Sequence, residues 1–112
     1  MKEVKAYLRP DKLEPVIASL EKAGARDMTV IRVEAIGGMA EEEQRRLFRK
    51  YHEKYEAVSK LEVVCTDEEA RRFAKIIREE AVTGMRGDGR IFVSDVDYAL
   101  DILSGKEGDE AL

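Results

Sequence analysis

The 112-residue sequence predicts an α+β domain in which four strands and two helices follow one another as β-α-β-β-α-β. Segments with a two-residue apolar period alternate with segments of helical period, and glycines mark several of the boundaries between them. This order is that of the ferredoxin-like arrangement, in which two helices cover one face of a four-stranded antiparallel sheet. Because a chain of this length has room for one core, we expect a single domain over residues 1–112.

The first third of the chain predicts a strand, a helix and a second strand. In "KEVKAYL" (residues 2–8) polar and apolar residues alternate, as in a strand with one buried face. "PDKLEPVIASLEKAG" (10–24) has apolar residues at helical spacing, and we expect Asp11 to cap its start and Gly24 its end. "MTVIRVEAI" (28–36) is rich in β-branched residues and stops before two glycines, which indicates a strand.

The second half predicts a strand, a helix and a last strand. "KLEVVCT" (60–66) is an apolar strand, and its Cys65 is expected to be a buried, inert thiol because the chain has no second cysteine. "DEEARRFAKIIREEA" (67–81) carries acidic residues in its first turn, as the helix dipole favours. "RIFVSDVDY" (90–98) is the fourth expected strand.

Charge and hydropathy exclude several classes of function. Twenty basic and 24 acidic residues give a net charge of −4, which argues against a general nucleic-acid-binding face. The sequence has no apolar run long enough to insert in a membrane, and its first residues lack the pattern of a secretory signal, so we expect a cytoplasmic protein. Since two helices cover only one face of the sheet, we also expect self-association to cover the other.

A long connection, residues 37–58, separates the second and third expected strands. Such connections are usually functional or disordered, and this one contains pairs of opposite charge at helical spacing. We consider two interpretations: a helical excursion that packs on its own oligomer, and a protruding element that orders on a partner protein. In the second, the contact residues are Leu47, Phe48, Tyr51 and Tyr55. His52 with flexible acidic neighbours is a poor metal cage, so no metal site is expected.

A glycine-rich loop, residues 82–90 in "VTGMRGDGRIFV", precedes the last strand. Glycines let backbone N–H groups approach phosphate oxygens, and Arg90 can add a charge-assisted contact. A plain tight turn explains the same glycines equally well. From the residues alone, both interpretations stay open.

The segments "TGMRGDGRIFVSDV" and "SGKEGDEAL", together with "MTVIRVEAIG" and the long loop after it, resemble the PII signal-transduction family. The family pattern in the loop is Thr-Gly, two residues, Gly-Asp-Gly, a basic residue and Ile-Phe-Val, which residues 83–93 satisfy. The resemblance implies a homotrimer, adenine-nucleotide sites in clefts between subunits, and a protruding loop that docks on target proteins. It implies a regulator and not an enzyme.

The resemblance also assigns roles to individual residues. It places Thr29, Gly37 and Gly38 at the base of the long loop, Val64 beside the adenine, and Gly87, Gly89 and Arg90 at the phosphates. Asp88 belongs to the same loop and is counted among the nucleotide-binding residues, although we expect its main role to be to brace the turn. The C-terminal segment, residues 99–112, completes the expected domain.

Four residues depart from the family pattern. Met39 stands where the family has a magnesium-binding glutamine, and Val58 where it has a lysine for 2-oxoglutarate. Asp101 and Leu103 replace two arginines that reach the polyphosphate. We therefore expect a divergent PII-like protein that binds AMP or ADP rather than ATP with magnesium and 2-oxoglutarate, and that regulates a membrane transporter or a metabolic enzyme.

The sequence also bears on two other functions. A trimeric ferredoxin-like assembly module without a nucleotide, similar to the divalent-cation-tolerance proteins, fits the same elements. An enzyme is disfavoured, because one histidine, one apparently buried cysteine and no paired carboxylates in an apolar context leave little for acid–base or nucleophilic catalysis. Tyr51 occupies the position that some family members modify, but the sequence around it does not resemble theirs.

Overall fold

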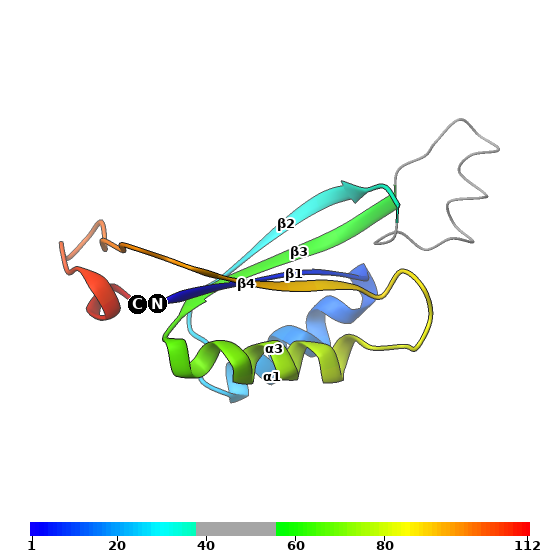
Figure 1. Cartoon of the computed structure of the whole chain (residues 1–112), viewed down its shortest axis with the longest axis horizontal. Helices are drawn as coiled ribbons and strands as arrows, with labels where there is room; N and C mark the ends of the chain where they lie inside the picture. Colours follow the sequence, from blue (N-terminus) through cyan, green and yellow to red (C-terminus); the bar gives the residue numbers. More distant parts are fainter. Residues whose placement is uncertain (38–55) are drawn as a thin grey trace.

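Four strands form one antiparallel sheet in the computed structural model, which describes residues 1–37 and 56–112 (Figure 1). The strands are β1 (Lys2–Leu8), β2 (Met28–Ala35), β3 (Glu56–Cys65) and β4 (Gly89–Asp95), in the spatial order β2-β3-β1-β4. The helices α1 (Leu13–Lys22) and α3 (Asp67–Ala81) lie side by side on one face of the sheet. This confirms the α+β, ferredoxin-like fold.

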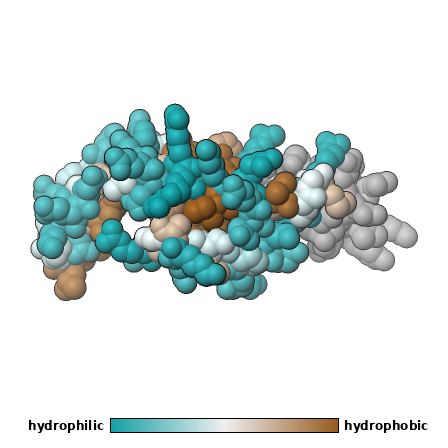
Figure 2. Space-filling model, turned by 90° about the horizontal axis from the view of Figure 1, so that it is seen from below, coloured by the Kyte–Doolittle hydropathy of each residue, from teal (hydrophilic) through white to brown (hydrophobic). Residues whose placement is uncertain are grey.

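The hydrophobic core lies between the sheet and the two helices. Val4, Ala6 and Leu8 of β1 are all buried on the helix side, as their alternation predicts. Phe73 and Ile77 of α3 pack against them at 1% and 2% exposure. The opposite side of the helices is largely hydrophilic (Figure 2), which is typical of amphipathic helices on a sheet.

The start of α1 differs from the sequence prediction. Residues Pro10–Lys12 form a short 3-10 turn, the helix begins after Lys12, and no side chain caps it, so the prediction that Asp11 caps the helix is wrong. The proline places the first turn before the helix proper, and Asp11 falls inside that turn. At the other end Gly24 has φ +99°, and its N–H donates to the Glu21 carbonyl, which confirms its role in ending the helix.

A capping box starts α3. The Glu69 N–H donates to Thr66 Oγ1 at 3.3 Å, and the Glu69 carboxylate accepts from the Thr66 N–H at 3.1 Å. The sequence signal, a threonine three residues before a glutamate, is local and could have been used. Among the causes that lower the pKa of Glu69, the hydrogen bond from the Thr66 side chain is the largest.

Two strand limits also differ from the expected ones. β3 begins at Glu56, opposite Ala35 of β2, so the last three residues of the expected 37–58 loop belong to the strand. Val58 is one of them and is 5% exposed, because it packs beside Ala35 in a small second cluster. β4 ends at Asp95 and does not reach residue 98.

The face of the sheet opposite the helices is charged and aromatic. Lys5 pairs with Glu3 at 3.4 Å, and Lys60 pairs with Glu62 at 2.7 Å. On the same face the rings of Tyr7 of β1 and Phe92 of β4 meet edge to face, with centroids 6.2 Å apart. Along each strand these charged and aromatic side chains alternate with the residues that face the helices, as the two-residue period requires.

Candidate functional site

The glycine-rich loop 82–90 is held by the carboxylate of Asp88. This carboxylate accepts hydrogen bonds from the Thr83 and Gly84 N–H groups at 2.9 and 3.0 Å and from the Thr83 hydroxyl. Arg9, at the end of β1, adds an ion pair at 3.0 Å and also donates to the carbonyl oxygen of Arg86. Asp88 therefore braces the turn, as expected, and a direct contact of Asp88 with a nucleotide stays a prediction.

The Asp88 carboxyl is a permanent anion at neutral pH. Burial raises its pKa, but the hydrogen bonds from Thr83, together with those from Arg9 and Gly84, lower it more, and the result is a pKa of about 2. The loop is thus closed by charge-assisted hydrogen bonds, which are stronger than neutral ones.

Gly89 is required by the packing of the sheet. It has φ +105°, and a Cβ at this position would lie 1.7 Å from the carbonyl oxygen of Tyr7 on β1. Any side chain here would force β4 away from β1. Gly87 also has a positive φ, of +95°. The glycine pattern of the loop therefore has a structural cause in addition to any role in phosphate binding.

Arg90 follows the loop as the second residue of β4. It pairs with Tyr7 of β1 in the register of the sheet and is exposed. Its guanidinium is therefore accessible to a ligand on the charged face. Arg90 and Gly89 also line a hollow of about 290 Å³, next to Asp88 and the end of α3.

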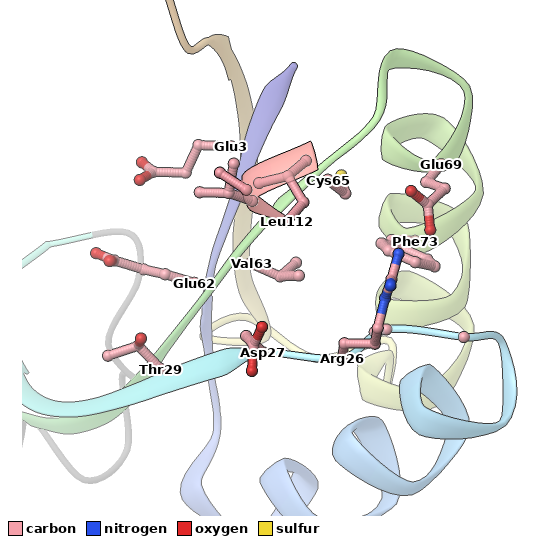
Figure 3. Close-up of a pocket in the computed structure, with 14 residues that line it drawn as sticks. Glu3, Arg26, Asp27, Thr29, Glu62, Val63, Cys65, Glu69, Phe73 and Leu112 are labelled. Carbon is pink, nitrogen blue, oxygen red and sulfur yellow. The ribbon is translucent and has the colours of Figure 1, made fainter. Parts of the chain in front are cut away.

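A second group of predicted site residues lines a pocket of about 240 Å³ at the other end of the sheet (Figure 3). Thr29, the second residue of β2, and Val64, near the end of β3, contribute to its wall. The C-terminal Leu112 closes it opposite the start of β2. Glu3, Asp27 and Glu62 make its rim acidic, and sequence reasoning had not assigned them to a site.

The two groups of site residues do not meet within one chain. Val64 pairs with Glu3 of β1, whereas Arg90 pairs with Tyr7, four residues further along the same strand. At about 3.3 Å per residue, this separates them by about 13 Å along the strand. They also lie on strands that flank β1 on opposite sides.

The remaining predicted residues belong to the long loop. Gly37, with φ +89°, lies just after β2. Gly38, Met39, Leu47, Phe48, Tyr51, His52 and Tyr55 fall outside the described residues. The expected helix or docking role of this loop therefore stays a prediction.

A hairpin-like segment follows β4, from Tyr98 to Glu107. Leu100 and Glu107 form a bridge, and the Tyr98 hydroxyl donates to the Glu107 carboxylate at 3.0 Å. The Asp101 carboxylate accepts from the N–H and hydroxyl of Ser104, at 2.7 and 2.6 Å. These hydrogen bonds, from the side chain first, lower the pKa of Asp101, so its charge persists at neutral pH.

The tip of this segment is the most exposed apolar part of the described chain. Ile102 and Leu103 are 99% and 96% exposed. The space-filling view shows an apolar patch at this end of the molecule (Figure 2). Such fully exposed large apolar side chains are typical of surfaces that another molecule covers.

Arg9 braces the glycine-rich loop, and no pattern in the sequence indicates this role. It lies 79 residues from Asp88, so no local pattern links the two. Cys65, in contrast, is 3% exposed and free, as predicted, and burial raises the pKa of its thiol. Within residues 1–37 and 56–112 no group of three or more metal-ligating side chains occurs, and no helix is long and apolar enough to cross a membrane.

Comparison with known proteins connects this architecture to one family. The family model described as "Nitrogen regulatory protein P-II" matches residues 1–106. "Nitrogen regulatory protein P-II 2" of Methanothermobacter thermautotrophicus is 38% identical over 112 residues, which cover the whole of this chain and 97% of that protein. "Nitrogen regulatory protein P-II" of Pasteurella multocida and of the alga Porphyra purpurea are 35% and 33% identical over the full length of both chains.

A match of this length covers the sheet, both helices, the glycine-rich loop and the start of the C-terminal segment together. The resemblance first seen in the loop "TGMRGDGRIFV" therefore extends to the whole domain. The chain belongs to the nitrogen regulatory P-II family, whose members are regulatory signal-transduction proteins.

Proposed function

We propose that this protein is a cytoplasmic, homotrimeric PII-type regulator that binds an adenine nucleotide in clefts between subunits. The observation that carries the proposal is the separation of the two site groups within one chain, by about 13 Å along β1. In the proposed trimer, a nucleotide in the cleft contacts one group from each of two copies. Family members form trimers and bind adenine nucleotides, which supports this assembly.

In this cleft the two groups have different chemistry. The loop 82–90 offers backbone N–H groups at Gly87 and Gly89 and the exposed cation of Arg90, which suit phosphate oxygens. The pocket beside Thr29 and Val64 has an apolar wall and an acidic rim, which suit a nucleoside and repel phosphate. The ligand would thus lie with its base in one subunit and its phosphates at the loop of the next.

We further propose that ADP or AMP is preferred to ATP. Asp101 keeps its negative charge and Leu103 offers none where the family has arginines, so a third phosphate gains little. Val58 is buried beside Ala35 and cannot supply a counter-charge for 2-oxoglutarate. Met39 offers a thioether, which is a poor magnesium ligand, in place of the glutamine.

We assign the regulatory output to the connection between β2 and β3, which contains most of the expected 37–58 loop. Family members act on partner proteins, and the sequence of this connection contains the residues that we propose for such a contact, Leu47, Phe48, Tyr51 and Tyr55. We propose that the loop docks on a membrane transporter or a metabolic enzyme. The single domain, residues 1–112, would supply the nucleotide sites that control it.

Titration calorimetry of the full chain tests the nucleotide site. We expect binding of ADP and AMP at least as tight as that of ATP, and little gain from magnesium with 2-oxoglutarate. Arg90→Ala should weaken ADP binding by about tenfold or more, the effect of one lost charge-assisted hydrogen bond. Lys75→Ala, which removes an exposed cation from the outer side of α3, is the matched control and should bind as the parent does.

One observation favours a second function. Gly89 is required by its contact with β1 and Asp88 is occupied within its own loop, so the glycine pattern does not depend on a nucleotide. This supports an assembly module without a ligand. Thermal unfolding with AMP, ADP and ATP separates the two functions, because only a nucleotide-binding protein is stabilised by them.

A further inference from the structure

The Asp27 carboxylate differs from the other acidic side chains of the 240 Å³ pocket in having no partner among the described residues. It lies just before β2 and lines the pocket with Thr29 (Figure 3). Four carboxylate side chains contribute to this pocket, and three are engaged: Glu3 with Lys5, Glu62 with Lys60, and Glu69 in the capping box of α3. Among the interactions of the described residues, none engages the side chain of Asp27.

The neighbouring cation does not neutralise it either. The guanidinium of Arg26 extends toward Glu69 and Phe73, on the other side of the hollow from Thr29 (Figure 3). Its charge contributes to the lowered pKa of Glu69, after the larger effects of Thr66 and Arg72. Both oxygens of Asp27 are therefore available as acceptors toward a bound molecule.

The position of Asp27 sets which part of a nucleotide it can reach. Asp27 and Thr29 both line the pocket and are two residues apart, about 7 Å at the rise of an extended chain. Thr29 of β2 pairs with Glu62 of β3, whereas Asp27 is exposed just before β2 begins. A nucleoside whose base lies along Val64 and Thr29 would thus place its sugar near Asp27.

We propose that Asp27 accepts hydrogen bonds from the two ribose hydroxyls of the bound nucleotide and so selects ribonucleotides. This inference rests on the proposed function. A vicinal diol presents two adjacent donors to the two oxygens of one carboxylate, and in dinucleotide-binding folds an acidic residue likewise accepts from a ribose hydroxyl. An adenine edge presents a donor next to an acceptor, so it would satisfy one oxygen of Asp27 and oppose the other.

Calorimetry with four ligands tests the proposal: ADP, 2′-deoxy-ADP, 3′-deoxy-ADP and IDP. The parent protein should bind ADP about tenfold more tightly than either deoxy analogue, the effect of one charge-assisted hydrogen bond. In Asp27→Asn this ratio should fall to about threefold or less. Asp11→Asn, which changes an exposed carboxylate in the 3-10 turn, should keep the full ratio. Unchanged thermal unfolding of Asp27→Asn would show that the variant is folded.

Three results would overturn the inference while leaving the nucleotide site in place. The first is equal binding of ADP and both deoxy analogues by the parent. In the second, Asp27→Asn tightens all four ligands alike, so that the carboxylate acts only as a repelling charge. In the third, Asp27→Asn alters the ratio of the affinities for ADP and IDP but keeps the ratio of the affinities for ADP and the deoxy analogues. Asp27 would then contact the base and not the ribose. Absence of any ADP binding would refute the proposed function itself, and this inference with it.

Discussion

The glycine-rich loop 82–90 and the hairpin-like segment 98–107 are each closed by an aspartate, but only the loop is also fixed to the rest of the protein. Asp88 accepts hydrogen bonds from the N–H and hydroxyl of Thr83, which precedes it in the chain. Asp101 accepts the same two hydrogen bonds from Ser104, which follows it. Only Asp88 is also tied to the body of the protein, by Arg9 of the segment after β1. The first loop is therefore built by one chain alone, whereas the second holds its shape but leaves its apolar tip uncovered.

The difference indicates where a second copy of the chain is needed. A loop that is braced on its own sheet can present backbone donors without a partner. A tip with Ile102 and Leu103 almost fully exposed gains from being covered, because each buried apolar side chain contributes about 1.5–3 kcal/mol. Four predictions test this contrast by changing matched residues in the two segments.

The largest effect is expected from the two glycines. Gly89→Ala places a Cβ against the Tyr7 carbonyl and should lower the free energy of unfolding by about 4 kcal/mol or more. Gly105→Ala meets open space and carries only the strain of its positive φ, +73°, so it should cost about 1 kcal/mol. Urea unfolding of both variants measures the difference. Similar losses would mean that β4 can move away from β1 at little cost.

The two aspartates should differ next. Asp88→Asn removes the ionic partner of Arg9, whose side chain is 13% exposed, and should lower the free energy of unfolding by about 2 kcal/mol. Asp101→Asn changes an exposed turn and should have a clearly smaller effect. Equal effects in urea unfolding would contradict the view that only the first loop is tied to the body.

Acid should destabilise the first loop through the same carboxyl. The folded pKa of Asp88, about 2, lies below its ordinary value of 3.8, so its contribution is present above pH 4 and is lost as the pH falls toward 2. Between pH 4 and pH 2 the free energy of unfolding of the parent should therefore fall by about 2 kcal/mol more than that of Asp88→Asn. Urea titrations at pH 5, 4, 3 and 2 give this difference, and parallel curves for the two proteins would refute the assignment.

The smallest effect on folding is expected at two exposed apolar residues. Leu103→Ser and Met85→Ser should each change the free energy of unfolding of the separate chain by no more than about 0.5 kcal/mol. In the proposed trimer, Leu103→Ser should weaken association more than Met85→Ser. Sedimentation equilibrium over a range of concentrations measures this, and an unchanged association constant in Leu103→Ser would show that the tip stays uncovered.

Local patterns were sufficient for most of the fold. The two-residue period placed Val4, Ala6 and Leu8 on the buried face, and the spacing of apolar residues located both helices. The errors occurred at element ends. Asp11 does not cap α1 because a proline starts a separate turn there, and β3 begins at Glu56 because β2 extends far enough to pair with it. Strand length depends on the partner strand, which a single segment does not encode.

The candidate site divides in the same way. The glycine pattern and Arg90 identified the loop and its family, and the expectation that Asp88 braces the turn followed from the chain alone. The pocket at the opposite end of the sheet was only half recognised: Thr29 and Val64 were named, but Asp27, Glu3 and Glu62 were not. They come from β1, from β3 and from the residue before β2, which are distant in sequence and are brought together by the sheet.

The order of elements, the buried thiol of Cys65 and the presence of a glycine loop were encoded in short stretches of sequence, because period and backbone freedom act over a few residues. The brace from Arg9 to Asp88, the need for glycine at position 89 and the free carboxylate of Asp27 were decided by the tertiary structure. Each of these features depends on whether two residues distant in sequence are in contact. The pairing of β1 with β3 and β4, and the packing of α3 on the sheet, decide which residues meet. Hydrogen bonds and steric overlap act only at contact distance, and the folded sheet sets those distances.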